Sequence, residues 1–242
     1  MLRPVLVFAG PSLPWAVRPQ HPRLEWAPPA IAGDLLARLD APPAAVALID
    51  GLFDSVPAVR HKEILALMAR GTRVLGAASM GALRAAELAP FGMQPVGAIA
   101  DAYVAGRLTG DDEVALAHGP AELGWPGLTE PLVNVRATLI AARRSGVLGR
   151  AQARAVLAAA RAVFWQDRSW AAVIAEAGAP ARPLGAWLPG GRIDLKRRDA
   201  LACVAAALAA RAAAAPSPEP PHTLFTIALA ERAASSPVRG VG

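Results

Sequence analysis

The chain has 242 residues, long enough for one large domain, or for a medium domain with a smaller appendage, around a substantial core. Cys203 is the single cysteine, so an internal disulfide and the cysteine-rich metal modules are both excluded. The formal net charge is +6, but Lys62 and Lys196 are the only lysines, and the other positive charges are arginines scattered among many alanines.

Three apolar segments of strand length recur in the first third of the chain, at residues 4–9, 44–49 and 72–78, and turn-forming residues follow each. Apolar residues at helical spacing over residues 31–40 and 59–70 predict a helix in each connection. This alternation is typical of parallel strands with right-handed crossovers. We therefore predict an α/β fold with a Rossmann-like parallel sheet in the N-terminal half, where ligands bind at the carboxyl ends of the strands.

The pattern becomes weaker in the middle of the chain. Residues 96–100 are compatible with a strand, residues 101–108 with a helix, and residues 113–117 with a short strand or an extended loop. Beyond residue 130 the sequence is alanine-rich and indicates four helices. These lie at residues 131–144, 150–165, 170–177 and 194–211.

We divide the chain into an α/β core at residues 1–135, a helical region at 136–213, and a proline-rich linker and tail at 214–242. The apolar N-terminal run is too short for a secretory signal, and the apolar run at residues 200–210 is too short to cross a bilayer. We expect a cytoplasmic protein without a membrane partner.

Residues 74–87 carry the most informative pattern: a buried strand leads into Ser79, and a helix begins at once. Small residues two positions to either side, Ala77 and Gly81, allow the sharp turn of a nucleophile elbow. The N–H of Met80 and the Gly10 loop would then supply an oxyanion hole. The alternative is that Ser79 is simply the N-cap of the helix, as serine often is.

Several residues are candidates for the base or the acid that would assist Ser79. His61, Lys62 and His118 lie beside the α/β unit, and Asp50 ends the second strand, where functional carboxylates are frequent. The acids at residues 111–113 lie between Ser79 and His118, which is the chain order of α/β-hydrolases. Each candidate has a structural alternative: a solvated first helical turn, a loop histidine, an Asp-Gly turn, or a turn after a glycine.

Further residues of the loops and of the new helix are candidates for substrate binding. Arg84 and Glu87 are spaced as a surface ion pair, or else line the mouth of the site. The complete candidate set for substrate binding is Gly10, Ser12, Met80, Gly81, Arg84 and Glu87. There is no Walker-type loop and no His, Asp and Glu at metal spacing, so we expect no cofactor and no metal.

Two clusters of basic residues offer a surface for an acidic protein or for nucleic acid, although genome base composition alone can produce such arginines. Nucleic-acid binders interleave aromatics or glycines with these charges, and this chain does not. We therefore expect an acidic protein or peptide partner and no nucleic acid. The clusters are Arg143, Arg144, Arg150 and Arg154, and Arg192, Lys196, Arg197 and Arg198.

Taken together, these segments resemble the TfuA-like core domain over roughly residues 5–134. The similar segments are VFAGPSL (7–13), IDGLF (49–53), HKEIL (61–65), GAASMGALRAAEL (76–88), PFGM (90–93), DDEV (111–114) and HGP (118–120). The resemblance implies a partner of a YcaO-type ATP-dependent enzyme in peptide backbone thioamidation. It also implies a ThiS-like sulfur carrier protein and a ribosomal precursor peptide as further partners.

Two functional hypotheses follow from the residues and the resemblance together. In the first, the chain is a thiohydrolase that releases sulfide from the thiocarboxylated carrier. Ser79 is the nucleophile, or orients a water that attacks, His61 or His118 transfers the proton, and Arg84 steers the anionic tail. In the second, it is a non-catalytic docking module that brings peptide or sulfur donor to YcaO, and Ser79 only caps a helix. A nucleotide-binding module is a weaker third possibility, because no Gly-x-Gly-x-x-Gly turn follows the first strand.

Overall fold

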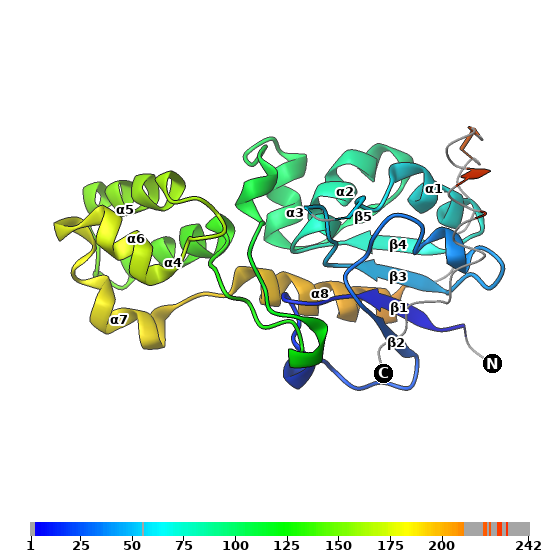
Figure 1. The fold of residues 1–242 in the computed structure, drawn as a ribbon, viewed down its shortest axis with the longest axis horizontal. Helices are drawn as coiled ribbons and strands as arrows, with labels where there is room; N and C mark the ends of the chain where they lie inside the picture. The colour runs from blue at the N-terminus through cyan, green and yellow to red at the C-terminus, as the bar shows by residue number, and fades with distance from the viewer. Residues whose placement is uncertain are drawn as a thin grey trace.

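The computed structural model describes residues 3–54 and 56–210, together with residues 220, 221, 223, 227, 228 and 231. A five-stranded parallel sheet in the order β2-β1-β3-β4-β5 forms its centre (Figure 1). The strands are β1 (Val5–Phe8), β2 (Leu24–Ala27), β3 (Ala45–Leu48), β4 (Arg73–Gly76) and β5 (Gln94–Pro95). The predicted α/β fold with a parallel N-terminal sheet is therefore confirmed.

The register of the sheet brings three strand ends together. Phe8 of β1 pairs with Leu48 of β3, and Leu48 pairs with Gly76 of β4, so the three strands end at the same level. In parallel sheets this carboxyl edge is where ligands bind. The loops that follow Phe8, Leu48 and Gly76 therefore share one edge of the sheet.

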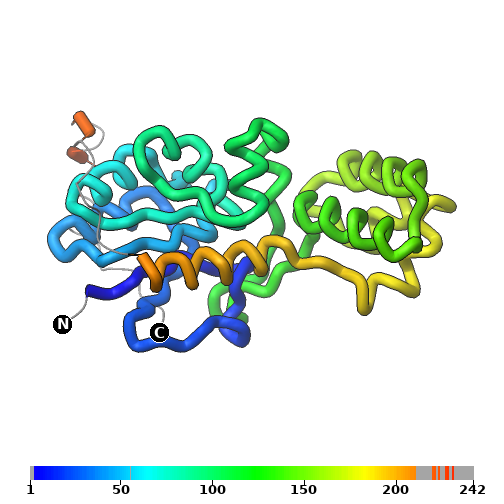
Figure 2. Tube along the Cα trace, turned by 180° about the vertical axis from the view of Figure 1, so that it is seen from behind, coloured from blue at the N-terminus to red at the C-terminus, as the bar shows by residue number. Residues whose placement is uncertain are grey.

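Helices cover both faces of the sheet. The helices α1 (His61–Ala69) and α2 (Met80–Leu88) pack on the face of Leu6 and Leu48. The long helix α8 (Leu195–Ala209) packs on the other face, where Cys203 is buried. Figure 2 shows α8 running along the sheet. The helix α8 thus belongs to the α/β layers, although it lies far from the strands along the sequence.

A cluster of helices lies to one side of the sheet and has its own apolar core (Figures 1 and 2). That core includes Leu139, Val156, Val173 and Leu184. We call this cluster the helical lobe. It consists of α4 (Leu132–Arg144), α5 (Arg150–Ala162), α6 (Trp170–Ala177) and α7 (Leu184–Gly191).

The first connection differs from the prediction. The chain after β1 forms the edge strand β2, and the expected helix over residues 31–40 is replaced by turns and a short 3-10 helix (Leu36–Arg38). The cause is the buried carboxylate of Glu63, which accepts hydrogen bonds from the N–H groups of Gly33 at 2.9 Å and Leu35 at 3.3 Å. This tertiary contact satisfies backbone donors that a helix would otherwise use.

In the middle of the chain one further expectation requires correction. Residues 96–100 are not a strand, because α3 (Gly97–Val104) begins there and Asp199 of α8 accepts a hydrogen bond from the N–H of Ile99. For residues 113–117 the loop alternative is confirmed, because residues 114–117 form a loop after a 3-10 turn (Asp111–Glu113). The helix α7 was not expected, because it contains Pro189 and three glycines.

The proline-rich segment at residues 214–242 lies almost entirely outside the described residues. Among the residues that are described, no helix has both the length and the apolar character needed to cross a bilayer.

Candidate active site

The turn between β4 and α2 is strained. The N–H of Ser79 donates to the carbonyl oxygen of Ala77 at 2.7 Å, which closes a γ-turn with Ala78 at φ +63°. A positive φ is unfavourable for any residue with a Cβ, and this form of the γ-turn is the rarer one. Strain of this kind persists only when the surrounding structure imposes it, and it often marks functional sites.

Close packing of α2 against β3 and β4 imposes the turn. A Cβ built on Gly81 would lie 1.7 Å from the carbonyl oxygen of Leu48, and one built on Gly76 would lie 2.1 Å from the carbonyl oxygen of Gly81. The N–H of Gly81 also donates to Ile49 at 3.1 Å. The helix can start this close to the sheet because neither glycine has a side chain.

The hydroxyl of Ser79 does not cap α2. Ser79 occupies the N-cap position, but its side chain makes no capping hydrogen bond, and the N–H of Ala82 donates to the Ser79 carbonyl oxygen instead. The hydroxyl oxygen lies 3.0 Å from the Nζ of Lys196. Capping alone therefore does not account for this serine.

Lys196 is the buried lysine of the site, with 2% of its surface exposed. Its Nζ contacts two oxygens, Ser79 Oγ and, at 2.7 Å, the carbonyl oxygen of Val114. Burial lowers the pKa of the Lys196 ammonium, and the negative charges of Asp50, Asp194 and Glu130 only partly oppose this. A neutral amine in this position can donate to Val114 and accept the proton of the Ser79 hydroxyl, which is the geometry of a general base.

The N-terminus of α8 fixes the position of Lys196. Asp194 caps the helix by accepting from the N–H of Arg197 at 3.0 Å, and the side-chain oxygen of Asn134 accepts from the N–H of Lys196 at 3.1 Å. The amide nitrogen of Asn134 in turn donates to Asp194. The lobe helix α4 therefore positions the catalytic candidate on α8.

Sequence reasoning missed the role of Lys196. It placed this lysine in a basic surface cluster because arginines follow it at positions 197 and 198. The one feature of the sequence that could have drawn attention to Lys196 is the rarity of lysine, which occurs only twice in the chain. Proximity to Ser79 across 117 positions could not be read from the sequence.

Asp50 joins the loops after β1 and β3. Its carboxylate accepts hydrogen bonds from the N–H of Gly10 at 2.8 Å, the N–H of Ser12 at 3.0 Å and the hydroxyl of Ser12 at 2.6 Å. Pro11, Asp50 and Ser79 also line one pocket, so the loops after β1, β3 and β4 meet at one site. Because the Gly10 N–H is bonded to Asp50, it is not a free oxyanion donor.

Two other backbone donors remain near the serine. Among the described residues, neither the N–H of Met80, the first of α2, nor the N–H of Gly51 has a hydrogen-bond acceptor. Gly51 lines the pocket of Ser79, and its backbone approaches Met80 so closely that a Cβ would lie 2.8 Å from the Met80 side chain. These two N–H groups are therefore the candidates for oxyanion donors.

The pocket has a volume of about 270 Å³ and lies where the sheet edge, the 114–118 loop and the helical lobe meet. The N-termini of α2 and α8 both lie at this site, because they carry Ser79 and Lys196, and helix N-termini favour negative charge. A small anionic group therefore fits its chemistry. The lining residues are Pro11, Pro29, Asp50, Gly51, Leu52, Phe53, Asp54, Ser79, Val114, Ala115, Leu116, Ala117, His118, Trp165, Gln166 and Lys196.

The three expected bases occupy different places. His118 lines the pocket, but its Nδ1 lies 2.9 Å from the Gly119 carbonyl oxygen rather than near a carboxylate. His61 is half-exposed and its Nε2 lies 2.7 Å from Glu87. Lys62 donates to the carbonyl oxygen of Pro221, and neither it nor His61 lines the pocket.

The expected binding residues Arg84 and Glu87 lie away from the pocket. Arg84 pairs with Glu87, so these two residues form a surface ion pair and do not line the pocket.

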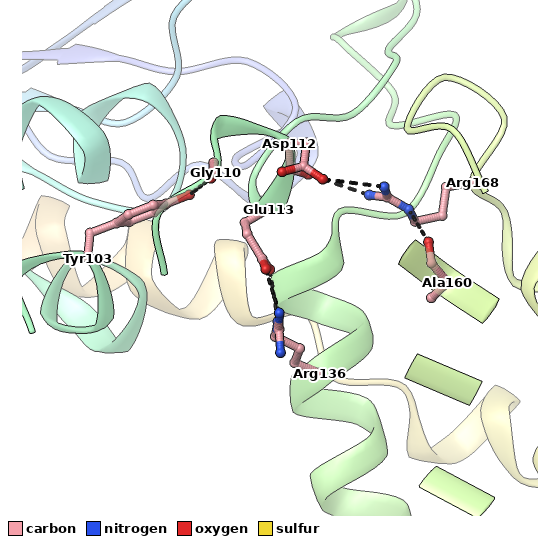
Figure 3. Close-up of polar contacts among 7 residues, drawn as sticks. All are labelled: Tyr103, Gly110, Asp112, Glu113, Arg136, Ala160 and Arg168. Atoms are coloured by element: carbon pink, nitrogen blue, oxygen red, sulfur yellow. Dashed lines mark hydrogen bonds and ion pairs between the residues drawn. The ribbon is translucent and has the colours of Figure 1, made fainter. Parts of the chain in front are cut away.

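The acids at residues 111–113 do not form a triad with Ser79 and His118. Glu113 forms a two-pronged ion pair with Arg136 of α4, and Asp112 faces the buried Arg168, which also donates to the Ala160 carbonyl oxygen (Figure 3). These contacts hold the segment of residues 111–114 against the helical lobe. They therefore position Val114, whose carbonyl oxygen accepts from Lys196.

Among the described residues, no group of three or more His, Cys, Asp or Glu side chains is arranged to hold a metal ion. Comparison with known proteins adds one match: residues 50–169 fit a family model described as TfuA-like protein. The matched segment contains Asp50, Ser79, Val114 and His118, whereas Lys196 lies beyond its end. A search of curated proteins gave no match.

Proposed function

The chain belongs to the TfuA-like protein family, which is associated with YcaO-type thioamidation, and we propose that it is a thiohydrolase with Ser79 and Lys196 as its catalytic pair. The observation that carries this proposal is the 3.0 Å contact between Lys196 Nζ and Ser79 Oγ inside a pocket. A serine activated by a buried lysine is a known alternative to the Ser-His-Asp arrangement.

The first half of the reaction breaks the carbon–sulfur bond of a terminal thiocarboxylate. Neutral Lys196 accepts the hydroxyl proton while Ser79 Oγ attacks the carbonyl carbon. The N–H groups of Met80 and Gly51 stabilise the oxyanion. Lys196 then gives this proton to the departing sulfur, which leaves as HS⁻ as the carbon–sulfur bond breaks, and an ester links Ser79 to the rest of the substrate.

The second half hydrolyses this ester. Lys196 takes a proton from a water molecule that attacks the ester carbon, and then returns a proton to Ser79 Oγ as the ester bond breaks. The substrate leaves as a carboxylate and one proton is released to solvent. The net reaction consumes one water and yields one HS⁻, so it needs no cofactor.

The chemistry of the pocket supports an anionic substrate tail. Two helix N-termini meet in a small pocket, which favours a slim, negatively charged chain end over a bulky acyl group. The C-terminal thiocarboxylate of a ThiS-like carrier has this form. In this proposal the released sulfide is used by a YcaO-type enzyme on a ribosomal precursor peptide.

The docking hypothesis assigns Ser79 a capping role only. That role is not supported by the position of the hydroxyl, which makes no capping bond and faces Lys196. The strained turn at Ala78 likewise supports a catalytic role, because a cap needs no such strain.

The test measures sulfide release from a thiocarboxylated ThiS-like carrier. Ser79→Ala and Lys196→Met should each reduce turnover by about 10³-fold or more, as loss of a nucleophile or its base does. Lys62→Met is the matched control, because it removes the other lysine of the chain, and it should retain turnover. Full activity in folded Ser79→Ala or Lys196→Met protein would exclude the proposed mechanism.

A further inference from the structure

A second, larger cavity of about 700 Å³ lies between α3 and the lobe helices α4 and α5. None of its lining residues lines the catalytic pocket, and the two are separated by the N-terminus of α8, where Leu195 faces the groove and Lys196 faces Ser79. We call this cavity the arginine groove. Its lining residues are Ala98, Ile99, Ala102, Arg107, Leu108, Val133, Arg136, Ala137, Leu139, Ile140, Arg143, Arg150, Ala153, Arg154, Leu157 and Leu195.

Positive charge dominates the rim of the groove. Five of the lining residues are arginines and none is an acid. Arg136 pairs with Glu113. The other four, Arg107, Arg143, Arg150 and Arg154, are exposed and have no ion pair or side-chain hydrogen bond to any described residue.

The floor of the groove is aliphatic. Ile140 of α4 is 50% exposed, and the partly buried Leu157 of α5 and Leu108 also line the cavity. Ile140 does not belong to the buried apolar core of the helical lobe. Its burial by a partner would be favourable at roughly 25 cal/mol per Å² of apolar surface.

These features define the chemistry of an occupant. An aliphatic floor between helices, with arginines along the rim, is complementary to an amphipathic helix that has an apolar stripe and flanking carboxylates. Nucleic acid fits less well, because no aromatic residue lines the groove to stack on bases. We propose that the arginine groove is a docking site for an acidic amphipathic helix of a partner protein.

This docking site goes beyond the proposed hydrolysis and does not depend on it. A defective Ser79→Ala protein should still bind the helix, and a protein with an altered groove should keep its catalytic pair. Failure of one proposal is therefore distinguishable from failure of the other. Binding is the readout for the groove, and sulfide release is the readout for Ser79 and Lys196.

The probe is a fluorescently labelled helical peptide of roughly 15 residues, with leucines recurring every three or four positions and glutamates beside them. A peptide of the same composition in scrambled order controls for the apolar stripe.

The key variant, Arg143→Glu/Arg154→Glu, reverses one unpaired charge on each wall of the groove. The matched control, Arg144→Glu/Arg161→Glu, makes the same charge change on exposed positions of the same helices outside the groove.

We expect the patterned peptide to bind the full chain saturably, and to bind at least about tenfold more weakly to Arg143→Glu/Arg154→Glu while the control is unchanged. A peptide with lysine in place of glutamate should recover binding to the charge-reversed variant. The proposal is overturned if the scrambled peptide binds equally well, if both variants lose binding equally, or if no saturable binding occurs. Competition by a single-stranded oligonucleotide at lower concentration than the peptide would also overturn it.

Discussion

Lys196 at the start of α8 and Ser79 at the start of α2 place their Nζ and Oγ atoms 3.0 Å apart, although α2 and α8 cover opposite faces of the sheet. Both helices begin at the carboxyl edge of the sheet, which is why side chains from opposite layers meet. The sheet thus lies between the two helices along their length, and their first turns come into contact at its carboxyl edge.

The rate of sulfide release should depend on the protonation of Lys196. Because burial lowers the pKa of this ammonium, the neutral, active form is present at lower pH than for an ordinary lysine. We expect kcat/KM to rise with pH to a plateau, with an apparent pKa below the ordinary lysine value of about 10.4. A pH profile whose midpoint lies at or above that value would contradict this assignment.

Replacement of Lys196 by Met should stabilise the fold while it removes activity. A lysine with a lowered folded-state pKa binds more protons in the unfolded state, so it weakens the fold at every pH below its unfolded pKa of about 10.4. We expect Lys196→Met to raise Tm by about 2–4 °C at neutral pH, the shift that corresponds to about 1 kcal/mol in a chain of this size.

This gain should be largest below the folded-state pKa and should shrink as the pH rises towards the unfolded pKa. Thermal melts at several pH values provide the measurement. A lower Tm for Lys196→Met at neutral pH would mean that the hydrogen bond to Val114 outweighs the cost of burying the charge.

The close contact of α2 with β3 should make Gly81 intolerant of any side chain. We expect Gly81→Ala to lower the free energy of unfolding by about 3 kcal/mol or more, because its Cβ would overlap the Leu48 carbonyl oxygen. Gly185→Ala is the control, since a Cβ there meets nothing within 4 Å, and it should be neutral or stabilising. Denaturant unfolding of both variants measures the difference, and equal stability would argue against the close approach.

The ion pair between Glu113 and Arg136 should affect catalysis indirectly. Glu113 precedes Val114, whose carbonyl oxygen accepts from Lys196, so Glu113→Gln should displace that acceptor. We expect kcat to fall about tenfold with little change in KM, because Glu113 does not line the pocket. Glu87→Gln, which breaks an exposed pair with Arg84, should change kcat less than twofold. Similar losses in both variants would refute a positioning role for Glu113.

The two histidines near the α/β unit should differ in their effect. His118 lines the pocket, so His118→Ala should raise KM or lower kcat by about tenfold. His61 pairs with Glu87 away from the pocket, and His61→Ala should leave turnover unchanged. A complete loss of activity in His118→Ala with full activity in Lys196→Met would identify His118 as the base.

The sequence alone was sufficient for the central strands β1, β3 and β4 and for the position of Ser79 at the strand-to-helix turn, but it did not indicate the edge strands β2 and β5. Apolar strands followed by turns, and the small residues around the serine, are local features, and their physical consequences act over a few residues. The register of β1, β3 and β4 then brought the loops of Gly10, Asp50 and Ser79 to one edge, as expected for parallel strands. The family resemblance rested on the same local segments.

The tertiary structure decided which side chain accompanies Ser79. The sequence suggested His61, Lys62 or His118 because they lie near the α/β unit along the chain, whereas Lys196 reaches the serine through the packing of α8 on the far face of the sheet. The same kind of long-range contact, from Glu63 to the backbone of residues 33 and 35, replaced an expected helix with turns. Local patterns fix the periodicity of each segment, but they carry no information about which distant group will satisfy a buried donor or hydroxyl.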